Sequence, residues 1–185
     1  LTGWNKQVGA FNESLSYDVN GNIKNLVRSK KDSVGGVSVM DNLSYTYVNG
    51  NQLNKVEDAA TAEGFNNGTV NGTNEYAYNN AGQLTQDQNK GISQVQYNVL
   101  GKVQQVSFTD GRQLSYAYDA SGQKLSMSVT QGGNTNTTDY VGNVVYENNT
   151  LAFFGSPEGR IVKVGNAYDY QYAIADHQGN TRLVF

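Results

Sequence analysis

The chain has 185 residues, with 21 glycines, 13 tyrosines, one proline and no cysteine, a composition that favours many short strands joined by turns and excludes disulfides and thiolate metal sites. Only 37% of the residues are hydrophobic, which is little for a protein organised around one large core. The formal net charge of -3 provides no basic surface for phosphate contacts, so nucleic acid is excluded as an expected partner.

The start of the chain shows no targeting signal. Residues 1–6 contain neither an initiator methionine nor the apolar centre of a signal peptide. No apolar run in the chain approaches the roughly 18 residues that a transmembrane helix needs. We therefore expect no transmembrane segment, and we expect the chain to be part of a larger polypeptide.

A short unit recurs along residues 1–130 and consists of a tyrosine, a turn with glycine, and an apolar residue. Its basic period is about 20 residues, which is typical of repeat architectures. Five copies lie at Tyr17–Ile23, Tyr45–Leu53, Tyr76–Leu84, Tyr97–Val103 and Tyr116–Leu125. The residues that define them, to which we assign a structural role, are Tyr17, Asp18, Gly21, Tyr47, Gly50, Tyr78, Gly82, Tyr97, Gly101, Tyr118, Asp119 and Gly122.

The last copy predicts a β-hairpin. Tyr116 and Tyr118 fall on one face of an extended strand, because side chains alternate along it. Asp119 can accept hydrogen bonds from the backbone that follows, and Gly122 adopts the left-handed conformation at little steric cost. The alternating residues 125–130 form the returning strand. Each copy is therefore expected to be one antiparallel hairpin, with tyrosine rings half-buried and their hydroxyls turned to water.

Two polar stretches interrupt the array of copies. Residues 29–36 and 58–74 lengthen two of the intervals, and 58–74 shows no apolar periodicity. We predict an extruded loop at each, and we expect 58–74 to be the most mobile segment.

The sequence indicates no cofactor, metal site or catalytic residue. Asp18 opens a stretch that resembles a calcium loop, but glycine holds its fourth position instead of the sixth, and Ser29 holds the twelfth, where glutamate is required. His177 is the only histidine, so a histidine-based triad would require a second chain or a different base. We expect an ordinary hairpin turn at Asp18 and turn-stabilising hydrogen bonds at His177.

The repeat pattern degrades beyond residue 130. Strands are expected at 151–154 and 160–164, around a tight turn at 156–159, and again at 168–174. The final turn has Gly179 as its pivot. Arg182 follows it and is expected to pair with a carboxylate such as Asp176 or Glu158.

The tandem Tyr-x-Tyr-Asp-x-x-Gly-x-Leu unit resembles the YD repeat of the Rhs family, which includes the C subunits of insecticidal toxin complexes and the teneurins. Residues 172–184 are similar to the Rhs-associated core signature, with Gln178 in place of its common leucine. Residues 140–148 and 156–160 are similar to the form that this core takes in Bacteroidetes. The core-motif residues, to which the resemblance assigns a structural role, are Tyr172, Asp176, His177, Gly179, Asn180 and Arg182.

The resemblance implies an all-β fold of tandem YD-repeat antiparallel hairpins, which form a strip of a spiralling β-sheet shell with an Rhs-core end segment. It divides the chain into a hairpin array at 1–130 and a core-like segment at 131–185. In the family, the shell encloses a C-terminal polypeptide that is often a toxin. Repeat physics agrees, since a hairpin with open edges needs neighbours on both sides. Family members often release this polypeptide at an aspartyl autocleavage motif, Asp-Pro-x-Gly-Leu, which the sequence lacks.

Three functions remain open at this point. The first is a non-enzymatic structural part of a secreted or cell-surface shell, whose candidate partners are the remainder of a larger Rhs chain, an enclosed toxin or cargo, and secretion machinery. The second is an adhesin-like extracellular module that binds glycans or a cell surface through its tyrosine rows and residues 58–74. The third is a self-processing core, for which no catalytic residue can be assigned.

Overall fold

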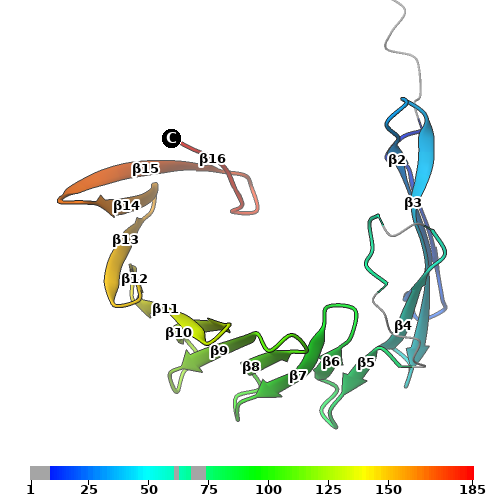
Figure 1. The fold of residues 1–185 in the computed structure, drawn as a ribbon, viewed down its shortest axis with the longest axis horizontal. Coiled ribbons are helices and arrows are strands. Elements are labelled where there is room, and N and C mark those ends of the chain that lie inside the picture. The colour runs from blue at the N-terminus through cyan, green and yellow to red at the C-terminus, as the bar shows by residue number, and fades with distance from the viewer. Residues whose placement is uncertain (1–8, 61–62, 68–73) are drawn as a thin grey trace, which may run out of the picture. The chain divides into compact units, whose positions relative to one another are not determined.

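Strands and turns make up the described part of the protein. The computed structural model describes residues 9–60, 63–67 and 74–185, and these residues form sixteen β-strands and no helix (Figure 1). The chain divides into two units, Leu1–Gln94 and Val95–Phe185. The prediction of an all-β fold built from antiparallel hairpins is confirmed.

The N-terminal unit begins with a four-stranded antiparallel sheet of order β1-β2-β3-β4. A short hairpin follows, in which Tyr76 of β5 pairs with Asp87 of β6. Asp87 pairs in turn with Ile92 of β7, the strand that spans the division between the units. The bounds are β1 Glu13–Tyr17, β2 Ile23–Lys31, β3 Val37–Val48, β4 Gln52–Asp58, β5 Tyr76–Tyr78, β6 Leu84–Asp87 and β7 Ile92–Tyr97.

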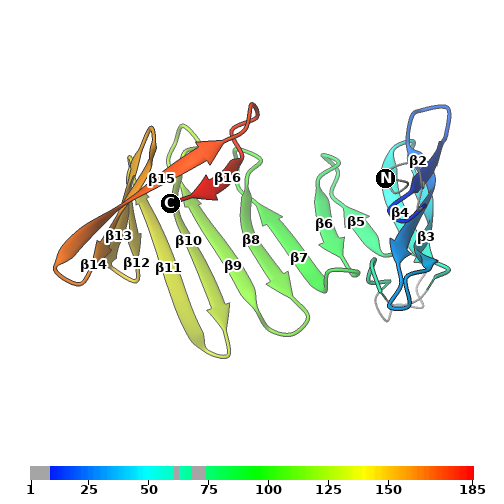
Figure 2. The same cartoon turned by 90° about the horizontal axis from the view of Figure 1, so that it is seen from above.

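The C-terminal unit follows the same up-and-down order. From β8 to β16, each strand pairs antiparallel with the next one along the chain, as Figure 2 shows for β9, β10 and β11. The bounds are β8 Val103–Phe108, β9 Gln113–Tyr118, β10 Lys124–Gln131, β11 Asn134–Val141, β12 Val144–Glu147, β13 Thr150–Ser156, β14 Gly159–Val164, β15 Ala167–Ala175 and β16 Thr181–Val184.

Apolar side chains are not gathered into a large core. Among the described residues, the buried apolar side chains are Leu43, Val56, Val95 and Val145. On β15, by contrast, Tyr170 is 61% exposed and Ile174 is 52% exposed. Backbone ladders and turns therefore contribute a larger share of the stability than in an ordinary globular domain, and the exposed apolar side chains are available to a further layer.

The loop predicted at residues 29–36 is wrong for residues 29–31 and is limited to residues 32–36 in the structure. Ser29, Lys30 and Lys31 belong to β2 and pair with β3. The remaining five residues form a tight turn that Asp32 closes by accepting the backbone N–H groups of Val34 and Gly36. Polar residues are tolerated in this strand because its side chains meet solvent, so polarity alone did not mark a loop.

The second interruption, residues 58–74, lies partly outside the described residues, at 61–62 and 68–73. Asp58 is the last residue of β4, and the described residues that follow it up to Asn74 form no strand or helix. The backbone N–H of Ala59 donates to the carbonyl of Asn42 at 3.0 Å. The described part of this segment is therefore fastened to β3.

The predicted boundary between a hairpin array at 1–130 and a core-like segment at 131–185 stays a prediction. Residues 130 and 131 are the last two of β10, whose pairing with β11 continues through both of them.

Candidate functional site

One turn geometry recurs along the described part of the chain. At Asp119, the backbone N–H groups of Ser121 and Gln123 both donate to Oδ1 at 2.9 Å, and the N–H of Gly122 donates to the Asp119 carbonyl at 3.0 Å. The Asp119 side chain thus accepts backbone N–H groups that would otherwise have no partner in so tight a turn. The same two side-chain bonds are made by Asp18, Asp32, Asn79, Asn98 and Asp176.

The second copy of the repeat departs from this geometry. Val48 stands where the other copies have Asp or Asn, so its side chain offers no acceptor. Asn49 and Gly50 instead both adopt positive φ angles, 49° and 88°. An Asn-Gly pair in this conformation is the preferred two-residue hairpin connection.

The glycine of each turn is required by its backbone conformation. Gly122 has a φ of +83°, and a Cβ at this position would overlap the end of the Lys102 side chain. We expect Gly122→Val to lower the free energy of unfolding by about 2 kcal/mol, because a β-branched residue is strained in the left-handed region. Urea denaturation measures the change.

Two control variants separate backbone strain from the loss of space. Gly111 has nearly the same φ, +84°, and open space where a Cβ would lie. Gly111→Val should therefore lower the free energy of unfolding by a similar amount, from strain alone. Gly122→Asn should lose less, because asparagine tolerates the left-handed region. An unchanged stability in Gly122→Val would contradict the turn assignment.

The repeat tyrosines join neighbouring hairpins. The hydroxyls of three of them donate to backbone carbonyls of the preceding copy, not to water as predicted for these residues. Each carbonyl belongs to the apolar residue that follows the turn of that copy. The pairs are Tyr47 with Ile23 at 2.9 Å, Tyr78 with Leu53 at 2.9 Å and Tyr118 with Val103 at 3.0 Å. The tyrosine therefore sets the spacing between successive hairpins as well as filling space.

The turn carboxylates have lowered pKa values. The side chain of Ser121 and the backbone N–H of Gln123 lower the pKa of Asp119. The Asn22 side chain lowers the pKa of Asp18, and the backbone N–H of Asn180 lowers the pKa of Asp176. These hydrogen bonds favour the ionised form in the folded state.

We expect the protein to lose stability in acid through these turns. Because the folded-state pKa of each carboxyl is lowered, its contribution to the free energy of unfolding is fully present above the unfolded-state pKa of about 3.9. This contribution is lost as the pH falls through the folded-state pKa. Urea midpoints measured between pH 7 and pH 2.5 should therefore fall mainly below about pH 4. In Asp119→Asn the fall should be shallower, because Asn79 and Asn98 hold the same turn without titrating. A pH profile identical to that of the unsubstituted protein would contradict this account.

The core-motif residues form the turn between β15 and β16. Asp176 Oδ1 accepts the N–H groups of Gln178 and Asn180 at 3.0 and 2.9 Å. Its Oδ2 accepts Arg182 Nε at 2.8 Å and Nη2 at 2.6 Å, which confirms the predicted pairing of Arg182 with a carboxylate. Gly179 has a φ of +82°, and His177 is exposed within the turn.

Tyr172 lies farther along the same hairpin. Its backbone N–H and carbonyl exchange hydrogen bonds with Phe185 at 2.9 and 3.0 Å. The two rings stack with centroids 5.8 Å apart. The core motif thus shapes one hairpin by contacts within it. Within the described residues, no group of three or more His, Asp or Glu side chains could hold a metal ion.

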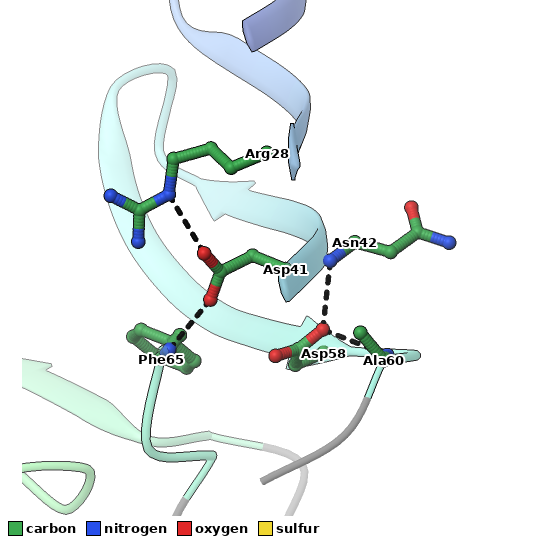
Figure 3. A network of polar contacts seen from close by, with 6 residues as sticks. All are labelled: Arg28, Asp41, Asn42, Asp58, Ala60 and Phe65. Atoms are coloured by element: carbon green, nitrogen blue, oxygen red, sulfur yellow. Dashed lines mark hydrogen bonds and ion pairs between the residues drawn. The ribbon is translucent and has the colours of Figure 1, made fainter. Parts of the chain in front are cut away.

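A buried carboxylate, Asp41, anchors the segment after β4 (Figure 3). Asp41 is fully buried on β3, at a position where the pairing with β2 is irregular. Its Oδ2 accepts Arg28 Nε at 2.7 Å, and its Oδ1 accepts the backbone N–H of Phe65 at 2.6 Å. Gly64 passes so close to the carboxylate that a Cβ there would overlap Asp41 Oδ1.

Asp58 supports the same segment from the end of β4 (Figure 3). Its Oδ1 accepts the backbone N–H groups of Asn42 and Ala60, each at 2.9 Å. Lys30 and Glu63 add an ion pair between β2 and this segment. At its described positions, the segment after β4 therefore folds back against β2 and β3.

A second buried carboxylate, Glu75, joins β4 to the hairpin that follows the segment. The Glu75 N–H donates to the Asn54 carbonyl at 2.8 Å, and its own carbonyl accepts the Gln88 N–H at 2.9 Å. Its Oε2 accepts the backbone N–H of Val56 and Asn89 Nδ2, each at 2.8 Å. The Glu75 side chain thus accepts the Val56 N–H, and Glu75 links β4 to the hairpin of β5 and β6. We call this set of contacts the Glu75 splice.

Other buried polar groups surround Glu75. Asp87 is 3% exposed and Asn89 is 9% exposed. Asn89 Nδ2 also reaches the Tyr76 hydroxyl at 3.2 Å. Burial raises the pKa of Tyr76, and the nearby Asp87 and Glu75 act in the same direction. The cluster therefore collects several oxygen atoms in a poorly solvated place.

Sequence reasoning missed both Asp41 and Glu75. A signal was present for each: Asp41 interrupts an otherwise alternating strand, and Glu75 is an isolated acidic residue directly before a Tyr-x-Tyr unit. Their partners Phe65, Val56 and Asn89 are brought to them by the tertiary fold, which the repeat pattern does not specify.

The comparisons with known proteins give structural matches only. No family model matches the chain, and no curated protein sequence matches it. A TcdB2-TccC3 crystal structure is similar at 16% identity and a TM-score of 0.46, and a TcdB2-TccC3-TEV structure at 13% and 0.48; each match covers 93% of this chain and 11% of that one. The Photorhabdus luminescens Tc holotoxin pore matches at 12% identity and a TM-score of 0.35, over 93% of this chain and 14% of that one. The chain thus spans a small fraction of each matched protein.

None of the described residues forms a helix long and apolar enough to cross a membrane.

Proposed function

We propose that this chain is a non-enzymatic structural part of an Rhs/YD-repeat shell that encloses or presents an attached C-terminal polypeptide. The observation that carries the proposal is the repeated hairpin, in units that bury few apolar side chains. Four of the five copies have the Asp or Asn turn, and three make the tyrosine link. Such hairpins are stabilised by neighbours on both sides, as in a wall.

The sequence motifs support a shell more than an isolated sheet. The repeats carry the YD pattern, and the turn at Asp176 carries the Rhs-core pattern with its internal Arg182 pair. The contacts of the core-motif residues hold a hairpin in shape, and none of them forms a constellation of nucleophile and base. We therefore assign these residues no catalysis, and we propose secretion or cell-surface display as the setting, in line with the Rhs resemblance.

Protease protection tests the proposal. The complete protein that carries this chain is produced with one epitope at its C-terminal end and another at its N-terminal end, and is digested under native conditions. We expect the C-terminal epitope to persist while the N-terminal one is removed. Equal loss of both epitopes would overturn enclosure. The intact mass of the same sample after denaturation tests self-processing, which an uncleaved product would exclude.

Glycan binding is the second candidate, and one hollow favours it. A depression of about 620 Å³ lies at turns of the N-terminal unit and is lined by Asn20, Asn49, Asn51, Gln52 and Tyr78, with two glycines. Amide groups and an aromatic ring are suited to sugar hydroxyls and ring faces. A glycan array that gives a signal with the unsubstituted protein and none with Asn51→Ala would support this function, whereas no signal would exclude it.

A further inference from the structure

Two buried oxygen atoms beside the Glu75 splice are not hydrogen-bonded to any described residue. They are Glu75 Oε1 and Asn89 Oδ1. Glu75 is 1% exposed and Asn89 is 9% exposed, so bulk water does not donate a hydrogen bond to either atom. Buried acceptors without a donor are uncommon in folded proteins, and each one left unpaired is costly.

The two oxygens belong to side chains that are hydrogen-bonded to each other. Asn89 Nδ2 lies 2.8 Å from Glu75 Oε2, so covalent geometry limits the separation of the two remaining oxygens to about 7 Å. Both atoms are acceptors, one a carboxylate oxygen and the other an amide oxygen. A single small molecule with two donors can serve both atoms if it lies between them.

The surrounding protein donors are already engaged. The Val56 N–H donates to Glu75 Oε2. Asn89 Nδ2 is shared between Glu75 Oε2 and the Tyr76 hydroxyl. Lys55 of β4 forms an ion pair with Glu57 and interacts with Glu75 through its charge. Lys90 is 75% exposed and its Nζ lies 3.6 Å from Asp87 Oδ2.

We propose that Glu75 Oε1 and Asn89 Oδ1 hold one internal water molecule, which donates one hydrogen to each. A buried water of this kind serves polar groups that the protein leaves unpaired, and such waters make two to four hydrogen bonds as a rule. The water completes the polar splice between β4 and the β6–β7 turn. This site is independent of the proposed shell function, because it depends only on contacts inside the N-terminal unit.

Water-to-protein cross-relaxation in NMR spectra tests the site in the complete protein. A long-lived water should give cross-peaks of the same sign as intramolecular ones to the Asn89 side-chain amide and to the Val56 N–H. In Glu75→Gln, a side-chain amide nitrogen stands in place of Oε1 and cannot accept a hydrogen bond. The water then loses one of its two acceptors, so these cross-peaks should be lost. Hydrogen-exchange protection of the Val56 N–H should persist, because the introduced glutamine side chain keeps an oxygen to accept it.

The matched control is Glu57→Gln, the same substitution on β4, where the carboxylate forms an ion pair with Lys55. It should leave the cross-peaks unchanged. Absence of the cross-peaks in the unsubstituted protein, or their persistence in Glu75→Gln, would overturn the proposal. A rise in the urea midpoint on adding calcium, reversed by chelation and lost in Glu75→Gln, would assign the site to a hard cation and would also overturn it.

Discussion

Replacing Glu75 with alanine should lower the free energy of unfolding by about 2–5 kcal/mol, the largest effect expected of any substitution considered for this protein. The change removes the acceptor of the Val56 N–H and of Asn89 Nδ2, both of which are buried. Each buried donor left without a partner costs about 1–3 kcal/mol. Urea denaturation at neutral pH measures the loss.

The control for this substitution is Glu57→Ala on β4, the strand that Glu75 contacts. Glu57 is half-exposed and pairs with Lys55, and such an ion pair contributes about 0–1 kcal/mol. If Glu75→Ala were no more destabilising than Glu57→Ala, Glu75 would not be the splice between β4 and the following hairpin.

The second large effect is expected at Gly159, the first residue of β14. Its φ is +153°, and a Cβ there would overlap the carbonyl oxygen of Gln171 and lie 3.1 Å from the N of Ala173. The clash is with backbone of β15, which cannot move aside without breaking the pairing of Gly159 with Tyr172. Gly159→Ala should therefore cost about 3 kcal/mol or more.

Gly165→Ala provides the comparison, since Gly165 has a φ of +61° and open space around its Cβ. It should cost about 1 kcal/mol, from backbone strain alone. Hydrogen exchange should show faster exchange of β15 amides in Gly159→Ala and unchanged rates in Gly165→Ala. Equal stabilities of the two variants would show that the approach of β15 to Gly159 is not tight.

Local chemistry made much of the fold predictable. The alternation around Tyr116 and the Asp119–Gly122 turn predicted a hairpin, and β9 and β10 pair as expected. The same logic held at residues 151–164, where β13 and β14 flank a tight turn. These features depend on neighbours in sequence, which is why a pattern of a few residues was enough.

The errors arose where the partner is distant or where polarity was misleading. The polarity of residues 29–31 predicts a loop, yet they pair in β2, because a strand whose side chains reach solvent tolerates polar residues. The pattern also predicts tyrosine hydroxyls that meet water, but Tyr47, Tyr78 and Tyr118 donate to carbonyls 15 to 25 residues away. The roles of Asp41 and Glu75 follow from tertiary contacts that no local pattern encodes.

The contacts of Asp41, Asp58 and Glu75 explain how a repeat array accommodates an insertion. The segment after β4 is fastened through Asp41 and Asp58, and the array resumes at Glu75. An inserted segment therefore need not break the succession of hairpins, provided that its ends are held by buried carboxylates.

Cryo-electron microscopy of the complete protein that carries this chain tests the central claim most directly. The account predicts that β8 to β16 form part of a continuous β-sheet wall around a cavity, with the C-terminal polypeptide inside it or at its opening. A map in which these strands form a free-standing domain, with the C-terminal polypeptide exposed to solvent and no enclosing wall, would contradict the account.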